Sequence, residues 1–591
     1  MSNLSDLLPA GAGGKQVDFV ASGTLPSGQT VALKSNGQVE AITGVTEGAG
    51  TPVVFENARS DSCSAVYDSS NNKVVITYTD LGNSYYGTAV VGTVSGASIS
   101  FGTPVVFESA TVNATTATFD SNLNKVVIAY GDGGNSYYGT SIVGTVSGTS
   151  ISFGTAVVFE SAQATNLGST FDSTNNKIVI SYKDGGNSNY GTAIVGTVSG
   201  TSISFGTAVV FETAAVSGNT APVFDTANNK VVIAYRDEGN SSYGSAIVGT
   251  VSGTSISFGT AVVFNNSSSD EIGSAFDSNS NKVVIVYRDA GNSYYGTAIV
   301  GTVSGTSISF GAETVFNSAS MYYASPTFDS TNNKVVIPYT DVGNSSYGTT
   351  IVGTISGTSI SFGSEAVYES AATAYTAATY DSTNEKTVIA YQDQGNSSYG
   401  TGVVFQLASS NNTSFLGITD ADVASGASGS VTIKGGISTI KGGTYTITVV
   451  NSGSGNKYAI NGVEQSVLNL YEGATYKFDQ SSGTNAGHPF RFSTTSDGTH
   501  GGGSEYTTGV TTNGVPGNAG AYTQIVLASG AATLYYYCSV HSGMGGTANT
   551  LAIVPNSNYY VQTDGTLTTT TSTVLAGKAL SSTSINLDYT T

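Results

Sequence analysis

One phrase recurs along most of the chain: an aromatic residue, an aspartate, a polar turn and an apolar run such as KVVI. Each unit holds four β-rich runs separated by turn residues, here named strands A to D; one unit has STFD, KIVISY, YGTAIVGTV and SISFGTAVVFE. Such a unit is typical of a β-propeller blade, because stacking of neighbouring blades buries its apolar faces. The phrase starts at intervals of 52 residues, once 53, at Tyr67, Phe119, Phe171, Phe224, Phe276, Phe328 and Tyr380.

The two ends of the repeat region are incomplete in complementary ways. The region begins with an isolated D strand, GTPVVFE at 50–56, and ends with strands A, B and C, the last of which is YGTGVVFQLA at 399–408. Pairing of these two ends completes one blade and leaves no sheet edge exposed. The sequence therefore predicts a seven-bladed β-propeller over 46–408, closed by the strand 50–56.

Between strands B and C every unit carries the turn D-x-G-N-S. These turns resemble the Asp-box turns of sialidase-type propellers, although a tyrosine stands where those usually begin with Ser or Thr. A short carboxylate accepts backbone N–H bonds across a tight turn whose glycine takes a positive φ, so we expect structural turns; a bound cation is the alternative. The aspartates are Asp80, Asp132, Asp184, Asp237, Asp289, Asp341 and Asp393.

The connection from strand D to the next strand A keeps its length and changes its content. Because this connection and the B–C turn emerge on the same face of a blade, the variable side chains are expected around one mouth of the ring. Their mixture of amides, charges and phenols suits a polar ligand such as a glycan; drift in solvent-facing loops is the alternative. The candidate ligand-binding residues are Arg59, Asn113, Asn166, Asn219, Asp270, Glu271, Tyr322, Tyr323 and Tyr375.

Catalysis in the propeller is not expected. A sialidase needs several arginines around a substrate carboxylate, whereas the repeat region holds only Arg59, Arg236 and Arg288, at positions taken to be non-equivalent. A convergent acid and base pair is not visible either. We therefore expect no enzyme, and a glycan-processing propeller remains the second alternative function.

The stretch TLYYYCSVHSGMGG at 533–546 gathers residue types that are scarce in this chain, which has two cysteines, three histidines and three methionines in 591 residues. The spacing C-x-x-H-x-x-M, with a histidine upstream in GHPFRF, resembles the type 1 copper loop of the cupredoxins, especially the short amicyanin form. This resemblance implies a mononuclear copper site, and thiolate, imidazole and thioether donors suit copper. The implied ligands are His488, Cys538, His541 and Met544.

Two residues depart from the cupredoxin pattern. Pro489 follows the first histidine, where many cupredoxins have an Asn that steadies the cysteine loop, and Val540 stands where a Pro commonly precedes the second histidine. Both positions tune the potential and rigidity of such a site. A vestigial site kept for packing is the alternative to copper binding, and His500 is the one histidine outside the set.

The remaining segments predict three further parts. Residues 441–555 alternate apolar and polar residues between Gly-rich turns, which favours a cupredoxin-like β-sandwich. The segments 409–440 and 556–591 are expected to be two halves of a small β module that the sandwich interrupts. Residues 1–45 are expected to form a separate attachment segment. The predicted fold class is all-β throughout.

The phrases YYVQTDGTL and AGKALS, with the opening QVDFVASGTLPSGQTVALKSNGQVEAIT, resemble modular segments of tailed-bacteriophage structural proteins, notably marine ones. The resemblance implies a non-enzymatic virion surface protein, such as a tail fibre, spike or capsid fibre, made in the host cytoplasm and exposed on the particle. Its expected partners are other virion structural proteins and a host cell-surface glycan or protein. A copper electron-transfer protein on a propeller scaffold is the first alternative.

Composition excludes two classes of partner. With 19 Lys and Arg against 39 Asp and Glu, the net charge is −20, so no basic surface for nucleic acid is expected. No run approaches the ~18 apolar residues of a membrane span, and the start has no basic region followed by an apolar run, so neither membrane insertion nor an export signal is expected. The sequence leaves open whether the protein is a homo-oligomer.

Overall fold

The computed structural model describes residues 15–587 apart from 27, 35, 46, 411–413, 438–443, 452–454, 529, 553–556, 564, 566, 573 and 582–583. The first part of the expected attachment segment, 1–14, lies outside the described residues. The all-β prediction is confirmed, because the described elements are strands and short 3-10 turns. In the described part, no helix is long and apolar enough to cross a membrane. The chain forms two compact units, one of which is Thr46–Leu407.

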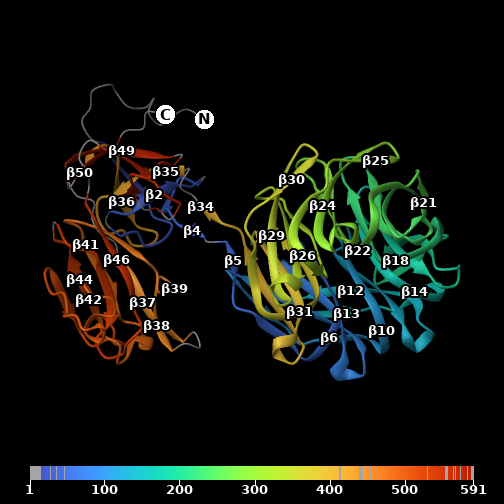
Figure 1. Cartoon of the computed structure of the whole chain (residues 1–591), viewed down its shortest axis with the longest axis horizontal. Coiled ribbons are helices and arrows are strands. Elements are labelled where there is room, and N and C mark those ends of the chain that lie inside the picture. Colours follow the sequence, from blue (N-terminus) through green and yellow to red (C-terminus); the bar gives the residue numbers. More distant parts are fainter. Residues whose placement is uncertain are drawn as a thin grey trace. The chain divides into compact units, whose positions relative to one another are not determined.

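The unit Thr46–Leu407 is the propeller (Figure 1). In every repeat the B strand pairs antiparallel with the C strand that follows it. The B strands are β7 (Lys73–Asp80), β11 (Lys125–Asp132), β15 (Lys177–Asp184), β19 (Lys230–Asp237), β23 (Lys282–Asp289), β28 (Lys334–Asp341) and β32 (Lys386–Asp393). The C strands are β8 (Tyr86–Ser95), β12 (Tyr138–Ser147), β16 (Tyr190–Ser199), β20 (Tyr243–Ser252), β24 (Tyr295–Ser304), β29 (Tyr347–Ser356) and β33 (Tyr399–Gln406).

Strand D differs from its sequence prediction, because it consists of two segments that both pair with strand C. The first segments are β9 (Ser98–Phe101), β13 (Ser150–Phe153), β17 (Ser202–Phe205), β21 (Ser255–Phe258), β25 (Ser307–Phe310) and β30 (Ser359–Phe362). In six of the seven cases the second segment of the D strand continues without a break into strand A of the next blade, and in the seventh the strand is interrupted at 323–326. These long strands are β6 (Val53–Asp68), β10 (Val105–Asp120), β14 (Val157–Asp172), β18 (Val209–Asp225), β22 (Val262–Asp277), β31 (Ala366–Asp381) and the interrupted pair β26 (Thr314–Tyr322) and β27 (Thr327–Asp329).

The ring closes through hydrogen-bonded pairing of its two ends. Strand β33 pairs antiparallel with β6 and with the short β5 (Gly48–Ala49), and the register places Gly402 opposite Val53 and Thr401 opposite Val54. The isolated D strand therefore lies beside the last C strand, as the incomplete ends of the repeat region predict. The result is seven blades of equivalent strand pairing.

Each blade is held by the same buried residues. The B strands are buried on both faces, and an aromatic residue of strand D packs on the B-strand tyrosine, with ring centroids 5.1 Å apart for Phe55 and Tyr78. The C strand passes so close to this aromatic ring that a Cβ on Gly87 would lie 2.4 Å from Phe107. Glycine is therefore required at that position by a close approach.

The seven turn aspartates accept backbone N–H bonds, as predicted, but a different residue takes the positive φ. Asp80 caps a 3-10 turn and accepts a hydrogen bond from the backbone N–H of Asn83 at 3.1 Å. The left-handed residues are Ser84 (φ 57°) and Tyr85 (φ 62°), whereas a Cβ on Gly82 would lie 2.4 Å from the Cβ of Ala58. The expectation of a positive φ at the glycine is wrong, since close packing requires it instead.

Six of these turns contain a 3-10 helix, and the turn after Asp184 makes the same carboxylate contacts without one. The helices are η2 (Leu81–Asn83), η3 (Gly133–Asn135), η4 (Glu238–Asn240), η5 (Ala290–Asn292), η6 (Val342–Asn344) and η7 (Gln394–Asn396). Every turn lies beside a D–A segment; Asp80, for example, pairs with Ser60.

The second unit contains a small sheet built from three parts of the chain. The prediction that residues 1–45 form a separate segment is wrong, because β1 pairs with β36 and β2 pairs with β35. The predicted module of 409–440 and 556–591 is therefore incomplete without the N-terminal strands. Its strands are β1 (Lys15–Val20), β2 (Thr30–Leu33), β3 (Val39–Ala41), β35 (Phe415–Thr419), β36 (Ser428–Ile437), β47 (Asn558–Val561), β48 (Leu567–Thr568), β49 (Leu575–Ser581) and β50 (Ser584–Leu587).

The chain segment that leads into the propeller pairs with the segment that leaves it, as a separate two-stranded sheet. Strand β4 (Gly44–Val45) pairs with β34 (Ser409–Ser410). The propeller and the sandwich are thus both insertions in the small module, one after β4 and one after β36.

Residues 444–551 form two sheets that share one core. The six-stranded sheet contains β37 (Thr444–Asn451), β38 (Asn456–Ile460), β39 (Val463–Glu464), β41 (Thr475–Asp479), β43 (Val510–Asn513) and β44 (Tyr522–Val526). The four-stranded sheet contains β40 (Leu468–Tyr471), β42 (Phe490–Ser493), β45 (Leu534–Cys538) and β46 (Gly546–Leu551). The turns η9 (Gly483–Asn485) and η10 (Gly498–Gly501) connect them.

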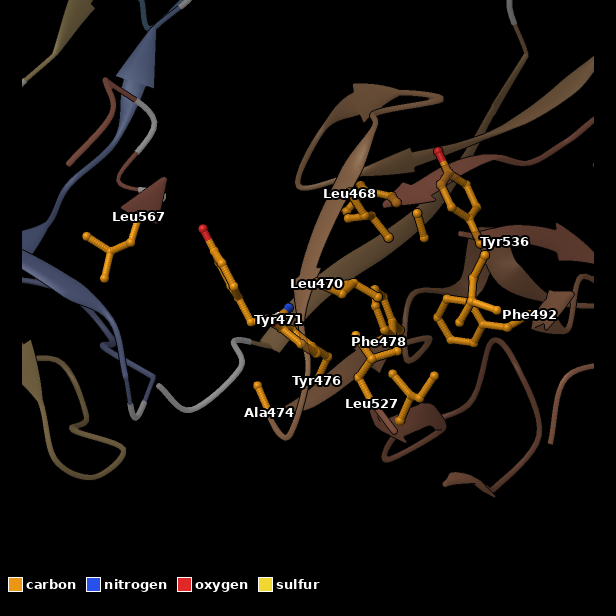
Figure 2. Packing of buried hydrophobic residues seen from close by; sticks show 14 of the residues in the cluster. Leu468, Leu470, Tyr471, Ala474, Tyr476, Phe478, Phe492, Leu527, Tyr536 and Leu567 are labelled. Carbon is orange, nitrogen blue, oxygen red and sulfur yellow. Dashed lines mark hydrogen bonds between the residues drawn. The ribbon is translucent and has the colours of Figure 1, made fainter. Parts of the chain in front are cut away.

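Aromatic side chains fill the space between these two sheets. Phe478 of one sheet stacks on Phe490 of the other with ring centroids 4.9 Å apart. Figure 2 shows Leu470, Phe478 and Leu527 gathered between the strands, with Phe492 close by. Buried residues of the small module belong to the same cluster, so the module and the sandwich pack as one unit. The assignment of the sandwich to the cupredoxins stays a prediction.

Candidate ligand-binding mouth and metal centre

The A strands line the centre of the propeller ring. Neighbouring A strands hydrogen-bond through their side chains, as between Thr116 Oγ1 and Ser169 Oγ at 3.0 Å and from Ser274 Oγ to the carbonyl of Ala221 at 3.0 Å. Just before each A strand a β-bulge shifts the register, and the bulge residue has a left-handed φ of 48° to 64°. The seven bulge residues are Ser62, Ala114, Asn166, Gly218, Glu271, Tyr323 and Tyr375.

These bulges define one mouth of the ring. Neighbouring bulges are linked, because Thr220 Oγ1 donates to the carbonyl of Asn166 at 2.9 Å and the N–H of Tyr323 donates to Glu271 Oε2 at 2.8 Å. A left-handed residue other than glycine costs roughly 1–2 kcal/mol, yet six of the seven positions carry a side chain. Left-handed residues also recur in the A–B turns, as at Asn72 and Asn124, so this conformation is a regular feature of the blades and the side chains placed on it are what distinguish the mouth.

Three tyrosines form a continuous contact chain on this mouth, here called the tyrosine arc. The ring centroids of Tyr322 and Tyr323 are 6.1 Å apart, and those of Tyr323 and Tyr375 are 5.1 Å apart. Tyr322 is 38% exposed, and the other two are half-buried. Strand β26 ends at Tyr322, so repeat six, counted from the unit of Tyr67 as repeat one, is the one described repeat whose long strand is interrupted.

Guanidinium groups lie at both ends of the arc. Arg288 places its Cζ 4.5 Å from the ring centroid of Tyr322 and 4.9 Å from that of Tyr294. Arg59 lies close to the phenol of Tyr375 at the other end. Cation–π contact of this kind orients the guanidinium plane and the ring together.

Each guanidinium of the arc is already paired with a carboxylate. Arg59 makes two hydrogen bonds to Asp61, at 3.0 and 3.1 Å. Arg288 donates to Asp270 Oδ2 at 3.0 Å, and Arg236 pairs with the other oxygen of the same carboxylate. The arc therefore presents little uncompensated charge.

Burial raises the pKa of two groups in or beside the arc. Desolvation, and then the neighbouring Tyr375 and Glu271, raise the pKa of Tyr323 to about 12, so that its phenol remains a hydrogen-bond donor. Desolvation also raises the pKa of the Glu271 carboxyl, and the nearby Arg288 opposes that shift.

The structure brings together six of the nine candidate ligand-binding residues, which belong to the arc, its ion pairs or the hydrogen bond to Tyr323: Arg59, Asp270, Glu271, Tyr322, Tyr323 and Tyr375. Asn113, Asn166 and Asn219 lie in repeats two to four, away from the contacts of the arc, with Asn219 exposed and the others half-buried.

Sequence reasoning missed Arg236 and Arg288 as members of this surface. They are equivalent rather than non-equivalent, because each directly precedes the aspartate of a B–C turn and pairs with a D–A residue, Ser217 and Asp270 respectively. The repeated phrase YRD was the signal for this equivalence.

Three of the four predicted copper ligands converge in the sandwich. Cys538 Sγ lies 3.9 Å from His488 Nδ1 and 3.7 Å from His541 Nδ1, and all three ligand atoms lie within 4.8 Å of one another. No other described group of three His, Cys, Asp or Glu residues comes together in this way. Met544 is buried in the same cluster as Cys538. Soft thiolate and thioether donors with two imidazoles fit copper.

The strands of the sandwich position these ligands. Cys538 ends β45 and pairs with Phe490, which follows His488 by two residues. The carbonyl of His488 accepts hydrogen bonds from Tyr458 Oη at 2.8 Å and Gln480 Nε2 at 3.0 Å. Desolvation, and then the neighbouring His541, lower the pKa of His488, which favours the neutral imidazole that binds metals.

Neither a protein-family model nor a curated protein matches the chain. Solved structures that it resembles include a lectin from Burkholderia pseudomallei, at 9% identity and a TM-score of 0.46 over 63% of this chain and 100% of that one. A Streptococcus pneumoniae sialidase is 11% identical, with a TM-score of 0.36 over 61% and 70%. An Aleuria aurantia lectin is 11% identical, with a TM-score of 0.34 over 54% and 98%. With TM-scores below 0.5, these likenesses carry no conclusion about this chain.

Proposed function

We propose that the chain is a non-enzymatic binding protein of a virion surface, and that its propeller recognises a host-cell saccharide at the tyrosine arc. The observation that carries this proposal is the arc itself. One sector of the ring concentrates three contacting tyrosines and two guanidiniums, and two of the tyrosines, Tyr323 and Tyr375, stand on left-handed bulge positions.

The chemistry of the arc suits an uncharged saccharide. Aromatic faces stack on the apolar faces of sugar rings, and phenol and guanidinium groups hydrogen-bond their hydroxyls. Both arginines at the arc are paired with carboxylates, so an acidic sugar would have to displace Asp61 or Asp270. The chain's net charge of −20 also disfavours acidic ligands.

The same contacts favour binding over catalysis. A nucleophilic tyrosine needs a lowered pKa, whereas that of Tyr323 is raised. Arg236 and Arg288 share one carboxylate instead of framing an open carboxylate-binding site. A glycan-processing enzyme is therefore not part of the proposal.

Binding of the full chain to an array of neutral and sialylated oligosaccharides tests the saccharide proposal. We expect retention of neutral members and no gain from a sialic acid. Binding of none of the array members would contradict the proposal.

The virion location rests on the resemblance of the flanking segments to tailed-phage proteins. Mass spectrometry and antibody labelling of purified particles from the source test it directly. We expect the chain on intact particles, and its absence from them would remove the location while leaving the saccharide proposal standing.

A second candidate function, copper binding, is favoured by the convergence of His488, Cys538 and His541. We propose that these residues, with Met544, hold one copper ion, which when bound would supply one-electron transfer. Titration with Cu(II) should produce an intense visible thiolate-to-copper absorption. Cys538→Ser should abolish it, whereas Cys63→Ser, at the other cysteine, should leave it unchanged. Equal spectra for both variants would contradict the site.

A further inference from the structure

The loop that carries three of the proposed copper ligands, Cys538 to Met544, is held near both of its ends by one short turn. The ring nitrogen Nε2 of His500 lies 3.0 Å from the carbonyl oxygen of Cys538. The backbone N–H of Gly543 donates to Asp497 Oδ1 at 2.8 Å. Asp497 and His500 belong to the turn around η10, more than 35 residues earlier in the chain.

The hydrogen bond to Cys538 fixes the role of His500. A carbonyl oxygen only accepts hydrogen bonds, so Nε2 of His500 must carry the proton and donate it. The His500 ring also meets Tyr537 edge-on, with centroids 6.4 Å apart. The one histidine outside the predicted ligand set therefore contacts the backbone of a ligand.

The turn has a backbone built for this contact. Asp497, Gly498 and Gly502 all have a left-handed φ, of 58°, 55° and 82°. A Cβ on Gly498 would lie 2.4 Å from the ring of Tyr537, so glycine allows the turn to rest directly on the residue before Cys538. The turn is thus seated on β45 by close packing.

Other residues hold the far end of the loop. Lys457 Nζ donates to the carbonyl of Gly543 at 2.7 Å, and the N–H of Tyr458 donates to the carbonyl of Met544 at 2.9 Å. The N–H of Ser539 donates to the carbonyl of Pro489 at 3.2 Å. This backbone bond joins the segment of His488 to the segment of Cys538 at Pro489, where many cupredoxins have an Asn.

We propose that Asp497 and His500 are positioning residues of the metal centre. They hold the loop so that Cys538 and His541 converge before a metal arrives. They also supply rigidity that many cupredoxins obtain from an Asn at the position of Pro489 and a Pro at the position of Val540. The inference rests on the proposed copper site. An ordered loop loses less conformational freedom on binding, and outer contacts of this kind change metal affinity by about 10–100-fold.

Two pairs of variants test the proposal. His500→Phe removes the donor and keeps an aromatic ring, whereas His500→Gln keeps an N–H donor. Asp497→Gly removes the carboxylate and tolerates the left-handed φ, whereas Asp497→Asn keeps the acceptor. The measurements are Cu(II) affinity by competition with a chelator, and amide hydrogen exchange of residues 539–543 in the metal-free full-length protein.

We expect His500→Phe and Asp497→Gly to lower copper affinity by about 10–100-fold and to speed exchange of the loop amides. The two conservative variants should stay near wild type. Wild-type values for all four variants in both measurements would overturn the proposal. If the wild-type protein binds no copper, the copper site fails, and faster exchange in the first member of each pair would still support the positioning role.

Discussion

The mouth of the propeller has two sectors that share a backbone and differ in side chains. In the plain sector, repeats two to four, the bulge residues are Ala114, Asn166 and Gly218. In the arc sector, repeats five to seven, the equivalent positions hold Glu271, Tyr323 and Tyr375, and repeat one, with Ser62 at its bulge, contributes Arg59 to the end of the arc. The left-handed φ is the same in both sectors. The bulge thus belongs to the architecture, and the side chain placed on it is free to serve recognition.

The residues that hold the blades do not follow this division. Phe159 of the plain sector packs on Tyr182 at 5.3 Å, and Phe316 of the arc sector packs on Tyr339 at 5.4 Å. Where Asn317 replaces the glutamate found in other repeats, Glu365 takes over and accepts the hydrogen bond of Tyr339 at 2.8 Å. The hydrogen bond of this buried tyrosine is thus kept by a different carboxylate.

The largest expected effect tests this equivalence of the two sectors. Phe159→Ala and Phe316→Ala should each lower the free energy of unfolding by about 3–5 kcal/mol, because each leaves a cavity beside a buried tyrosine. Urea unfolding of the full chain measures both. Costs that differ by more than about 2 kcal/mol would show that the sectors are not equivalent in packing.

An intermediate effect separates the sectors by function. Tyr323→Ala should weaken binding of the saccharide found on the array by about tenfold, or ~1.4 kcal/mol, through loss of the stacking surface. Asn166→Ala, at the equivalent bulge of the plain sector, is the matched control and should leave affinity unchanged. Isothermal titration measures both variants. A larger loss for Asn166→Ala would move recognition to the plain sector.

The smallest expected effect is on the pH dependence of stability. It distinguishes repeats with a glutamate beside the B-strand tyrosine, such as Glu160, from repeats with an asparagine at that position, such as Asn265. Burial, and then the carboxylate of Asp184, raise the pKa of Glu160, and the same causes, with Asp80, raise that of Glu56. Each of these carboxyls has a higher pKa in the folded protein than in the unfolded chain, so between its two values the folded state binds more protons. The free energy of unfolding therefore increases as the pH falls through the folded-state pKa.

Glu160→Gln removes one such carboxyl and keeps an acceptor for Tyr182, which donates to Glu160 at 3.1 Å. Thermal unfolding between pH 7 and pH 4 should show less gain in stability on acidification for Glu160→Gln than for the wild-type protein. Asn265→Gln, in a repeat without this glutamate, should gain as much stability on acidification as the wild-type protein. A larger gain in stability on acidification for Glu160→Gln than for the wild-type protein would contradict this prediction.

Local patterns in the sequence predicted the parts of the fold that depend on local chemistry. The period of the repeats predicted the blades, the incomplete ends predicted the pairing of β33 with β6, and the aspartates predicted the turns. The spacing of Cys538, His541 and Met544 put three candidate ligands on one loop, and the structure brings His488 to Cys538 through pairing of β42 with β45.

The parts that were missed depend on distant pairing. Strand β1 pairs with β36 across more than 400 residues, and no periodicity links the two segments. Asp270 bridges Arg236 and Arg288, which requires the register of two neighbouring blades. The left-handed bulges arise where a long strand leaves one blade for the next, and their varied side chains carry no shared sequence signal.

A crystal structure of the full chain with its best-bound neutral saccharide tests the central claim most directly. The account predicts a sugar ring against Tyr322 and Tyr323, with hydroxyls in hydrogen-bond contact with Tyr375 or Arg59, and the ion pairs of Asp61 and Asp270 intact. A saccharide seated in the plain sector or on the opposite face of the ring would contradict the account.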